Sequence, residues 1–414
     1  MRRYRGYVIV LAALSLAAAA CGDSGSSGSG GTSGSSETIT IGSLHPLTGG
    51  LAGAGKPMDN AVKMAVDDIN AAGGIKSMGG AKLKVASSDT QGKAEVGQSE
   101  AQRLTSSGAA ALVGTYQSDV TQNVAAVAER SAVPLVIDVA VADQILRQGY
   151  KYTFRVQPDA TSMGTKGADD LAAIGEQQKS PIKTVAYLHV QGDFGDSVFT
   201  AFQKEATAKG ISVAKEVSYD LAINDATTQV SQAAAVNPDA IVVTGYFPDS
   251  LLVAKAIGAL KPKVKAVYGI ANGGFDDERF PAAAGPAGEN ILSANYHFDA
   301  TSSAVKDIRQ RFQQKYGEPM QTAAILSYQA VQVIAKALED GKNADPKALR
   351  DAIAKVTVDQ PLLAFEGPIS FDDTGQNKNA IPIVMQVLSG KVEQVFPEKF
   401  KTVALTWPAV PAAA

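Results

Sequence analysis

The chain has 414 residues, with 38 Lys and Arg against 41 Asp and Glu, and it contains one cysteine. Because the formal charge is only −3 and the two signs are interspersed, the composition gives no support for nucleic-acid binding. A single cysteine excludes an internal disulfide, so the ordinary cores of about two domains must supply the stability.

Residues 1–20 have the layout of a bacterial secretory signal. Arg2, Arg3 and Arg5 precede an apolar run over 7–17 that is too short to span a membrane. Three alanines and then Cys21 follow, in an order that resembles a lipobox, the motif whose cysteine is diacylated. We therefore expect a lipoprotein signal peptide over 1–20 and a lipid anchor on Cys21, which places the protein on the outer face of the cytoplasmic membrane.

A flexible tether is expected next. Residues 21–36 are almost entirely Gly and Ser, which cannot bury apolar area and behave as a random coil. The folded body then begins at residue 37, and residues 405–414 form a C-terminal tail. The sequence has no second long apolar run, so we expect the body to be soluble.

Short β-rich runs alternate with helical patterns from residue 38 onward. In the first series, strands are predicted over 38–44, 83–88, 110–114 and 134–139, and helices over 58–71, 94–106 and 120–130. In the second series, strands are predicted over 184–189, 212–217, 240–244 and 265–269, and helices over 163–174, 198–209, 227–235 and 250–260. This alternation predicts an α/β fold with two doubly wound parallel-sheet lobes.

The remaining chain has too few strands for a third α/β domain. Strands are predicted over 291–295 and 381–388, and helices over 304–316, 323–338 and 346–355. These elements are expected to complete the first two lobes, so the chain crosses between the lobes more than once. Several crossings make a hinge, and the cleft between the lobes is the expected ligand site.

Two chemical motifs are incomplete. Gly50 and Gly55-Lys56 have the spacing of a phosphate-binding P-loop, but Pro57 stands where that motif needs Ser or Thr. We interpret the segment as a glycine-rich loop between a strand and a helix. The three histidines (His45, His189 and His297) have no second His or Cys at metal-ligand spacing, so no metal or cofactor is expected.

Two other strand-to-helix junctions are candidate ligand contacts. Ser118 opens a predicted helix, where it is an N-cap, a carboxylate site, or both. Tyr246 and Phe247 follow the strand over 240–244 and either pack in the core or point into the crevice. An exported hydrolase is an alternative that requires a histidine beside Ser118, although no Gly-x-Ser-x-Gly sequence follows a predicted strand.

Taken together, the chain from about residue 38 to about 395 resembles the type I periplasmic binding proteins, specifically the branched-chain amino acid (Leu/Ile/Val) family. The ordered strings that carry the resemblance are Leu44-His-Pro-Leu-Thr-Gly-Gly, Ala65-Val-Asp-Asp-Ile-Asn-Ala-Ala-Gly-Gly-Ile, Asp89-Thr-Gln-Gly, Val113-Gly-Thr-Tyr-Gln-Ser, Arg147-Gln-Gly-Tyr, Asp193-Phe-Gly-Asp-Ser and Gly367-Pro-Ile-Ser-Phe-Asp-Asp. The last string matches the family's late crossing strand.

The resemblance implies a Venus-flytrap fold whose lobes close around a small solute. It predicts crossings near residues 158, 292 and 375, which gives lobe 1 as 37–157 plus 292–374 and lobe 2 as 158–291 plus 375–404. It also implies a non-enzymatic monomer that delivers its solute to an ABC permease and the permease's ATPase. A ligand-sensing module for a membrane receptor would use the same closure and is the alternative.

Site residues are carried over position by position. In relatives, a serine at the position of Ser118 and the backbone near Ala140 hold the ligand carboxylate. Tyr116 lies in the same string as Ser118. Aromatic residues at Phe194 and at the Tyr246-Phe247 pair line the opposite side.

The departures from the family pattern concern the ligand ammonium. Relatives that bind α-amino acids have a Thr near positions 141–142 and an acid near 271, where this chain has Val141 and Ala142, and Ala271 and Asn272. A buried ammonium needs a counter-charge, for which Asp193 and Asp249 are the candidates. A tryptophan that narrows some relatives' pockets is replaced by Ala54. We therefore expect a carboxylate or amide ligand with a larger, less cationic body.

Overall fold

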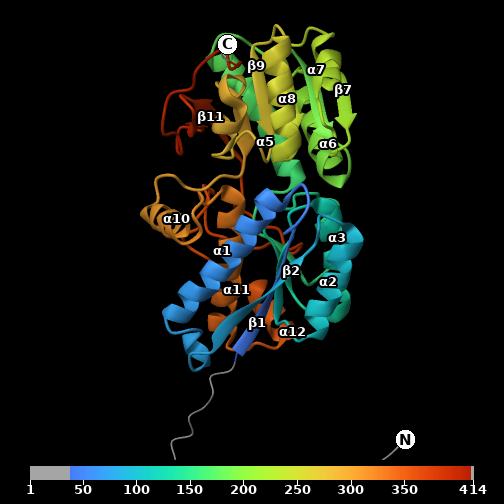
Figure 1. Ribbon diagram of the computed structural model, residues 1–414. Helices are drawn as coiled ribbons and strands as arrows, with labels where there is room; N and C mark the ends of the chain where they lie inside the picture. The colour runs from blue at the N-terminus through green and yellow to red at the C-terminus, as the bar shows by residue number, and fades with distance from the viewer. Residues whose placement is uncertain (1–37, 412–414) are drawn as a thin grey trace, which may run out of the picture. The chain divides into compact units, whose positions relative to one another are not determined.

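The computed structural model describes residues 38–411 (Figure 1). The predicted signal peptide, Cys21 and the tether lie outside these residues. Lobe 1 is built on a parallel five-stranded sheet in the order β2-β1-β3-β4-β5. Its strands are β1 (Thr38–His45), β2 (Lys82–Asp89), β3 (Ala111–Gly114), β4 (Leu135–Ile137) and β5 (Thr153–Arg155).

Helices cover both faces of this sheet because alternate residues of each strand point to opposite sides. Ile39 and Ile41 belong to the core shared with α1, whereas Leu44 and Leu112 belong to a separate core with α2 and α3. The helical segments of lobe 1 are α1 (Ala52–Ala71), η1 (Lys76–Met78), α2 (Ala94–Ser106), α3 (Ser118–Ser131), α4 (Gln144–Arg147), α10 (Ser303–Tyr316), α11 (Thr322–Gly341) and α12 (Pro346–Ile353).

Lobe 2 is built on a seven-stranded sheet in the order β12-β11-β10-β9-β8-β6-β7. Its strands are β6 (Thr184–Val190), β7 (Ser212–Tyr219), β8 (Ala240–Thr244), β9 (Ala266–Ile270), β10 (Leu292–Asn295), β11 (Ile383–Leu388) and β12 (Lys391–Phe396). The sheet is parallel from β7 to β10, and β11 and β12 add an antiparallel edge.

The helices of lobe 2 pack in pairs. Helix α5 packs along α6, and α7 packs against α8. Glycines allow the closest approach, since a Cβ on Gly164 of α5 would lie 2.6 Å from the Phe202 backbone nitrogen of α6. The helical segments are α5 (Ala160–Gln177), α6 (Asp193–Ala208), α7 (Thr227–Ala234), α8 (Phe247–Leu260), α9 (Phe280–Ala284) and η2 (Gly285–Gly288).

Late segments of the chain complete both lobes, and the predicted α/β architecture of two doubly wound lobes is confirmed. Figure 1 shows α11 lying along α1, which is about 270 positions earlier in the sequence. Arg311 of α10 donates to both carboxylate oxygens of Asp68 at 2.8 Å, and Tyr328 of α11 donates to the same carboxylate at 2.6 Å. Strands β11 and β12, which also come late in the chain, extend the sheet of lobe 2 at one edge.

Three expected boundaries need correction. Residues 292–295 were expected to begin the second part of lobe 1, but they form β10, whose Leu292 pairs with Tyr268 of β9 in lobe 2. The second crossing therefore follows Asn295. The string over 367–373 forms isolated pairings and no strand of either sheet. Within the expected tail over 405–414, Ala409 pairs with the start of β9.

The first and third crossings are bound to each other. Arg155 N–H donates to Gly375 O at 2.8 Å, and Asn377 N–H donates to Arg155 O at 3.0 Å. The fully buried Arg155 guanidinium also donates to Gln376 Oε1 at 2.7 Å, and the side chain of Asn377 donates to Val156 O at 2.8 Å. These contacts bind the two crossing segments side by side at the hinge. Within residues 38–411, no helix has the length and apolar character needed to cross a membrane.

Candidate ligand-binding cleft

Two neighbouring cavities lie at the carboxyl ends of the strands, and residues of both lobes line each of them. The inner cavity contains about 300 Å³ of space between atoms and the outer cavity about 510 Å³, the solvent at their mouths included. The two share Tyr116, Gly273 and Tyr296 as walls. The two cavities are therefore immediate neighbours in the cleft.

The inner cavity is built around the start of α3. Ser118 is the first residue of this helix, and Gln117 is its N-cap, so the expected N-cap role of Ser118 is wrong. The Ser118 hydroxyl instead accepts a hydrogen bond from Ala142 N–H at 3.2 Å. Because the oxygen accepts this bond, the hydroxyl proton remains available to a ligand oxygen. The Ala140 N–H donates to Thr115 O at 3.3 Å.

Aromatic side chains line the same cavity as Ser118. The ring centroid of Tyr246 lies 5.4 Å from that of Tyr116 and 5.1 Å from that of Phe194. Burial raises the pKa of the Tyr116 hydroxyl, which therefore stays neutral and can donate or accept. Gly273 allows this packing, since a Cβ there would lie 2.9 Å from the Tyr116 hydroxyl.

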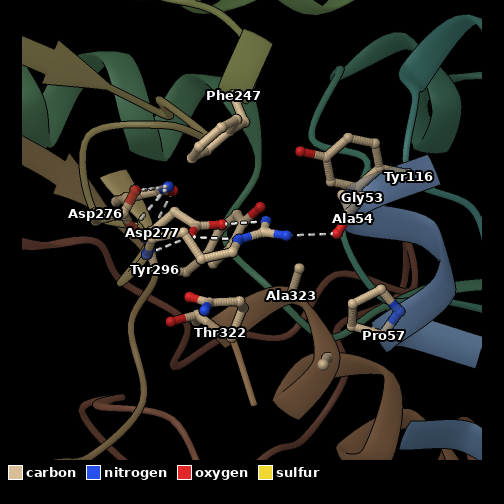
Figure 2. Close-up of a pocket in the computed structure, with 15 residues that line it drawn as sticks. Gly53, Ala54, Pro57, Tyr116, Phe247, Asp276, Asp277, Tyr296, Thr322 and Ala323 are labelled. Carbon is tan, nitrogen blue, oxygen red and sulfur yellow. Dashed lines mark hydrogen bonds and ion pairs between the residues drawn. The ribbon is translucent and has the colours of Figure 1, made fainter. Parts of the chain in front are cut away.

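The outer cavity combines an apolar surface with several charged and amide side chains and is shown in Figure 2. Arg279 projects across it and forms two hydrogen bonds with the Asp277 carboxylate, at 2.9 Å and 2.6 Å. Its third nitrogen, Nη1, donates to Gly53 O in lobe 1 at 2.8 Å. The ring of Phe247 lies 5.1 Å from the guanidinium carbon and covers the pair from one side.

Pro57 explains why the Gly53 carbonyl is free to bind across the cleft. Helix α1 contains Pro57, which has no N–H for the carbonyl four residues earlier. Gly53 is that residue, and its carbonyl accepts from Arg279 of lobe 2 instead. The Pro57 that breaks the P-loop pattern therefore leaves an acceptor at the rim of the cleft.

Asp276 is the most buried acid of the cleft. Its residue is 6% exposed, and its oxygens lie 3.2 Å and 3.4 Å from the Asn295 amide nitrogen. Burial raises the pKa of this carboxyl to about 8, and the nearby Asp277 charge acts in the same direction. Gln321 enters the same cavity from lobe 1, where its Oε1 accepts from Glu278 N–H at 3.0 Å.

The cavities bring together nine of the ten residues proposed as ligand contacts. Those in the inner cavity are Tyr116, Ser118, Ala140, Val141, Phe194, Tyr246 and Ala271, and Ala54 and Phe247 line the outer cavity with Tyr116. Asn272 lines neither cavity. Its amide oxygen accepts from the N–H groups of Gly274 and Phe275, both at 3.0 Å, so the side chain shapes the loop after β9.

The two acids considered as ammonium partners lie elsewhere. Asp249 accepts from Tyr246 N–H at 3.0 Å and from Tyr219 hydroxyl at 2.8 Å, within α8 and β7. Asp193 accepts from Gln122 of lobe 1, and its N–H donates to Asp119 at 3.2 Å. Neither side chain lines the two cavities.

A hydrolase site is not assembled around Ser118, whose hydrogen bond is to the Ala142 backbone. His45 lies inside lobe 1 and not at the cleft rim. Its ring contacts Ser43 Oγ at 3.0 Å and Asp138 Oδ2 at 2.7 Å, and all three side chains are buried. A substrate in the cleft could not reach this group.

Sequence reasoning missed the polar residues of the outer cavity. Asp276, Asp277 and Arg279 lie in one charged string just after β9, at the edge of the sheet where ligands bind. The charged string after a predicted strand could therefore have indicated these residues. Gln321 had no such signal, because only the crossing after Asn295 brings the start of α11 to the cleft.

The chain from residue 38 to 391 matches the family model described as periplasmic binding protein. It is similar to the Leu/Ile/Val-binding protein homolog 8 of Brucella abortus (strain 2308), with 27% identity over 375 residues, covering 87% of this chain and 91% of the relative. Two solved structures share the fold. One is the branched-chain amino acid transporter substrate-binding protein LivJ of Streptococcus pneumoniae in complex with isoleucine (24% identity, 86% and 98% coverage, TM-score 0.73). The other is a solute-binding protein of Rhodopseudomonas palustris BisB5 in complex with 3,4-dihydroxybenzoic acid (22% identity, 86% and 95% coverage, TM-score 0.75).

The family match covers most of the chain and the whole of both sheets except β12, of which it includes only the first residue. The resemblance identified from the sequence is thereby confirmed. The chain belongs to the periplasmic binding protein family, as a type I solute-binding protein of the ABC-transporter type and not an enzyme.

Proposed function

We propose that this protein is a lipid-anchored, extracytoplasmic binding protein that captures a small carboxylate- or amide-type ligand, an amino acid or a related compound, and delivers it to an ABC importer. The observation that carries the proposal is the pair of neighbouring cavities whose walls come from both lobes. A solute held there contacts both lobes at once, so it favours the closed arrangement by its differential affinity.

The inner cavity supports a carboxylate on the ligand. The Ser118 hydroxyl proton and the first N–H groups of α3 are donors, and the positive end of the helix dipole favours an anion beside them. The aromatic wall of Tyr116, Tyr246 and Phe194 suits an apolar body. Isoleucine and 3,4-dihydroxybenzoic acid, bound by the two solved relatives, both combine a carboxylate with an apolar skeleton.

The rim contacts support closure as the signal to the permease. Arg279 of lobe 2 binds Gly53 O of lobe 1, and Glu278 N–H binds Gln321 of lobe 1. Both contacts require the lobes to be together, so the surface that they hold exists only in the closed protein. A monomer anchored through Cys21 would present this surface to the permease.

A thermal-shift screen tests the proposal. The compact part of the chain, residues 36–414, is screened against amino acids, small carboxylates, amides and short peptides. A ligand at about 100 times its dissociation constant should add about 2.7 kcal/mol to the free energy of unfolding, which is a clear rise in melting temperature. Stabilisation only by compounds without a carboxylate or an amide would contradict the proposed ligand class.

A further inference from the structure

The amino end of α11 forms one wall of the outer cavity. Its first three residues, Thr322, Ala323 and Ala324, line the cavity. The first hydrogen bond of the helix runs from Ile325 N–H to Gln321 O at 3.1 Å, so the three N–H groups before it have no acceptor within the helix. The N-cap residue, Gln321, makes no side-chain cap bond, and the first turn contains no acidic residue. This wall therefore presents N–H donors and the positive end of the helix dipole.

Gln321 adds a side-chain donor that lacks a partner. Its residue is 8% exposed, and its Nε2 is buried without a hydrogen-bond partner among the described residues. Its Oε1 accepts from Glu278 N–H at 3.0 Å, which fixes the orientation of the amide and leaves the NH₂ group over. An unpaired buried donor is costly, and an acceptor bound in the cavity satisfies it.

Lobe 2 contributes donors as well. Asp277 accepts three hydrogen bonds from Arg279, one from its backbone and two from its guanidinium, and the third guanidinium nitrogen donates to Gly53 O. A guanidinium carries five N–H bonds, so two remain for a ligand. Burial raises the pKa of the Asp276 carboxyl to about 8, so at neutral pH this group is mostly protonated and is a donor too.

Apolar side chains form the rest of the cavity. Figure 2 shows Ala54 and Pro57 of α1 and Ala323 of α11 around the space into which Arg279 projects. A small organic acid suits such a wall better than a strongly hydrated inorganic anion, because its hydrocarbon part is removed from water there.

We propose that the outer cavity is an anion site, which binds the carboxylate of a small organic acid between the amino end of α11 and Arg279, independently of the inner cavity. The Gln321 amide and the first N–H groups of α11 donate from lobe 1, and Arg279 donates from lobe 2. Because the donors belong to both lobes, an anion held there stabilises the closed arrangement. This site goes beyond the proposed function, which places a carboxylate only at Ser118.

Three probes that share one ring test the chemistry of the site. 4-Fluorobenzoate carries a carboxylate, 4-fluorobenzamide a neutral amide and 4-fluorobenzylammonium a cation. In fluorine NMR titrations of the protein at pH 7, 4-fluorobenzoate should bind at two sites, one of which remains in Ser118→Ala. At that remaining site, the amide and the ammonium should each bind at least tenfold more weakly than the carboxylate.

One variant at Gln321 identifies the site. Gln321→Glu keeps the oxygen that accepts from Glu278 N–H and replaces the unpaired donor with a second oxygen. The helix dipole favours the ionised form of the new carboxyl, which repels the probe. This variant should weaken the binding of 4-fluorobenzoate that remains in Ser118→Ala by about tenfold or more.

Gln332→Glu is the matched control in the same helix. The Oε1 of Gln332 accepts from Gln329 Nε2 at 2.8 Å, a bond that a glutamate also accepts, and Gln332 lines neither cavity. The same change of charge at this position should leave the affinity for 4-fluorobenzoate unchanged at both sites.

The pH dependence gives an additional readout. Below about pH 8 the Asp276 carboxyl is protonated and donates, and above it the ionised form repels the anion. Affinity for 4-fluorobenzoate should therefore fall above about pH 8, by at most tenfold per pH unit, while the probe stays ionised throughout. Asp276→Asn, whose amide donates at every pH, should abolish the fall. The other titratable groups of the cavity are Tyr116 and Tyr296, which burial keeps neutral, and the Asp277–Arg279 pair.

The possible failures are distinct. If 4-fluorobenzoate binds at a single site that Ser118→Ala removes and Gln321→Glu leaves intact, the inference is wrong while the proposed function stands. Unchanged affinity of Gln321→Glu at the second site, or tighter binding of the amide or the ammonium there, also overturns it. If 4-fluorobenzoate binds only at the site that Gln321→Glu removes, the anion site stands and the carboxylate at Ser118 is rejected. If it binds at neither site, both are rejected.

Discussion

Replacement of Ser118 by alanine should affect stability and ligand binding by separate, calculable amounts. The hydroxyl accepts a hydrogen bond from Ala142 N–H, and Ala142 is fully buried, so water cannot replace the lost acceptor. A buried N–H left unpaired costs about 1–3 kcal/mol. We expect this loss in the free energy of unfolding of the ligand-free protein, which corresponds to roughly 1–4 °C in melting temperature for a body of this size.

The effect on the ligand adds to the structural effect. A hydrogen bond to a carboxylate contributes about 1.5–3 kcal/mol, so Ser118→Ala should weaken binding about 10- to 150-fold. Ser250→Ala is the control, because Ser250 is buried and its hydroxyl has no hydrogen-bond partner among the described residues. That variant should bind the ligand normally and lose no stability.

Urea unfolding of the ligand-free proteins and calorimetric titration with the ligand separate the two effects. A Ser118→Ala protein that loses stability but binds the ligand with unchanged affinity would show that the hydroxyl only supports the Ala142 backbone. A protein with unchanged stability would refute the calculation from the buried N–H. In either case the Ser250→Ala values define the background of a serine-to-alanine change in this fold.

Three further outcomes are expected. Cys21→Ser should move the protein from the membrane fraction to the soluble fraction, and persistent membrane association would contradict the lipid anchor. Gly55→Ala should cost several kcal/mol in urea unfolding, since its Cβ would lie 2.1 Å from Pro46 O, whereas Gly50→Ala meets no atom within 4 Å and should be nearly neutral. Burial raises the pKa of Asp249 from 3.8 to about 7, so the ionised form opposes folding and roughly 4 kcal/mol of stability is lost as pH rises from about 4 to 7. Asp249→Asn should become more stable relative to wild type over that range, and a constant difference would exclude the raised pKa.

Elements with strong local patterns were predictable from the sequence. The bounds of α2 (Ala94–Ser106) and β8 (Ala240–Thr244) agree to the residue with the prediction, because apolar periodicity and flanking turn residues coincide there. Helix α1 begins at Ala52 and not at residue 58, so the segment interpreted as a glycine-rich loop is mostly the first turns of this helix, which accommodates Pro57. The three-residue β5 is too short to produce a pattern.

Residues of the candidate site could be predicted only where a short stretch of sequence, just after a predicted strand, contains them. Ser118 and Tyr246 follow strands directly, so the edge rule for α/β sheets places them in the cleft. Asn272 lines neither cavity because its side chain turns back to the backbone of its own loop, a choice that depends on local geometry. The outer cavity brings together Asp276, Asn295 and Gln321. Their proximity depends on where the second crossing leaves the sheet, which composition and periodicity do not encode.

The interleaved topology has a consequence for the order of folding. Glu339 of α11 accepts hydrogen bonds from the N–H groups of Lys76 and Ser77, a separation of more than 260 positions. Ala409 pairs with the first residue of β9, in a sheet whose first strand along the chain is β6. Such contacts close long loops, which slows folding and leaves an N-terminal fragment without either finished core. Neither lobe can therefore complete its core until the late segments of the chain have been synthesised.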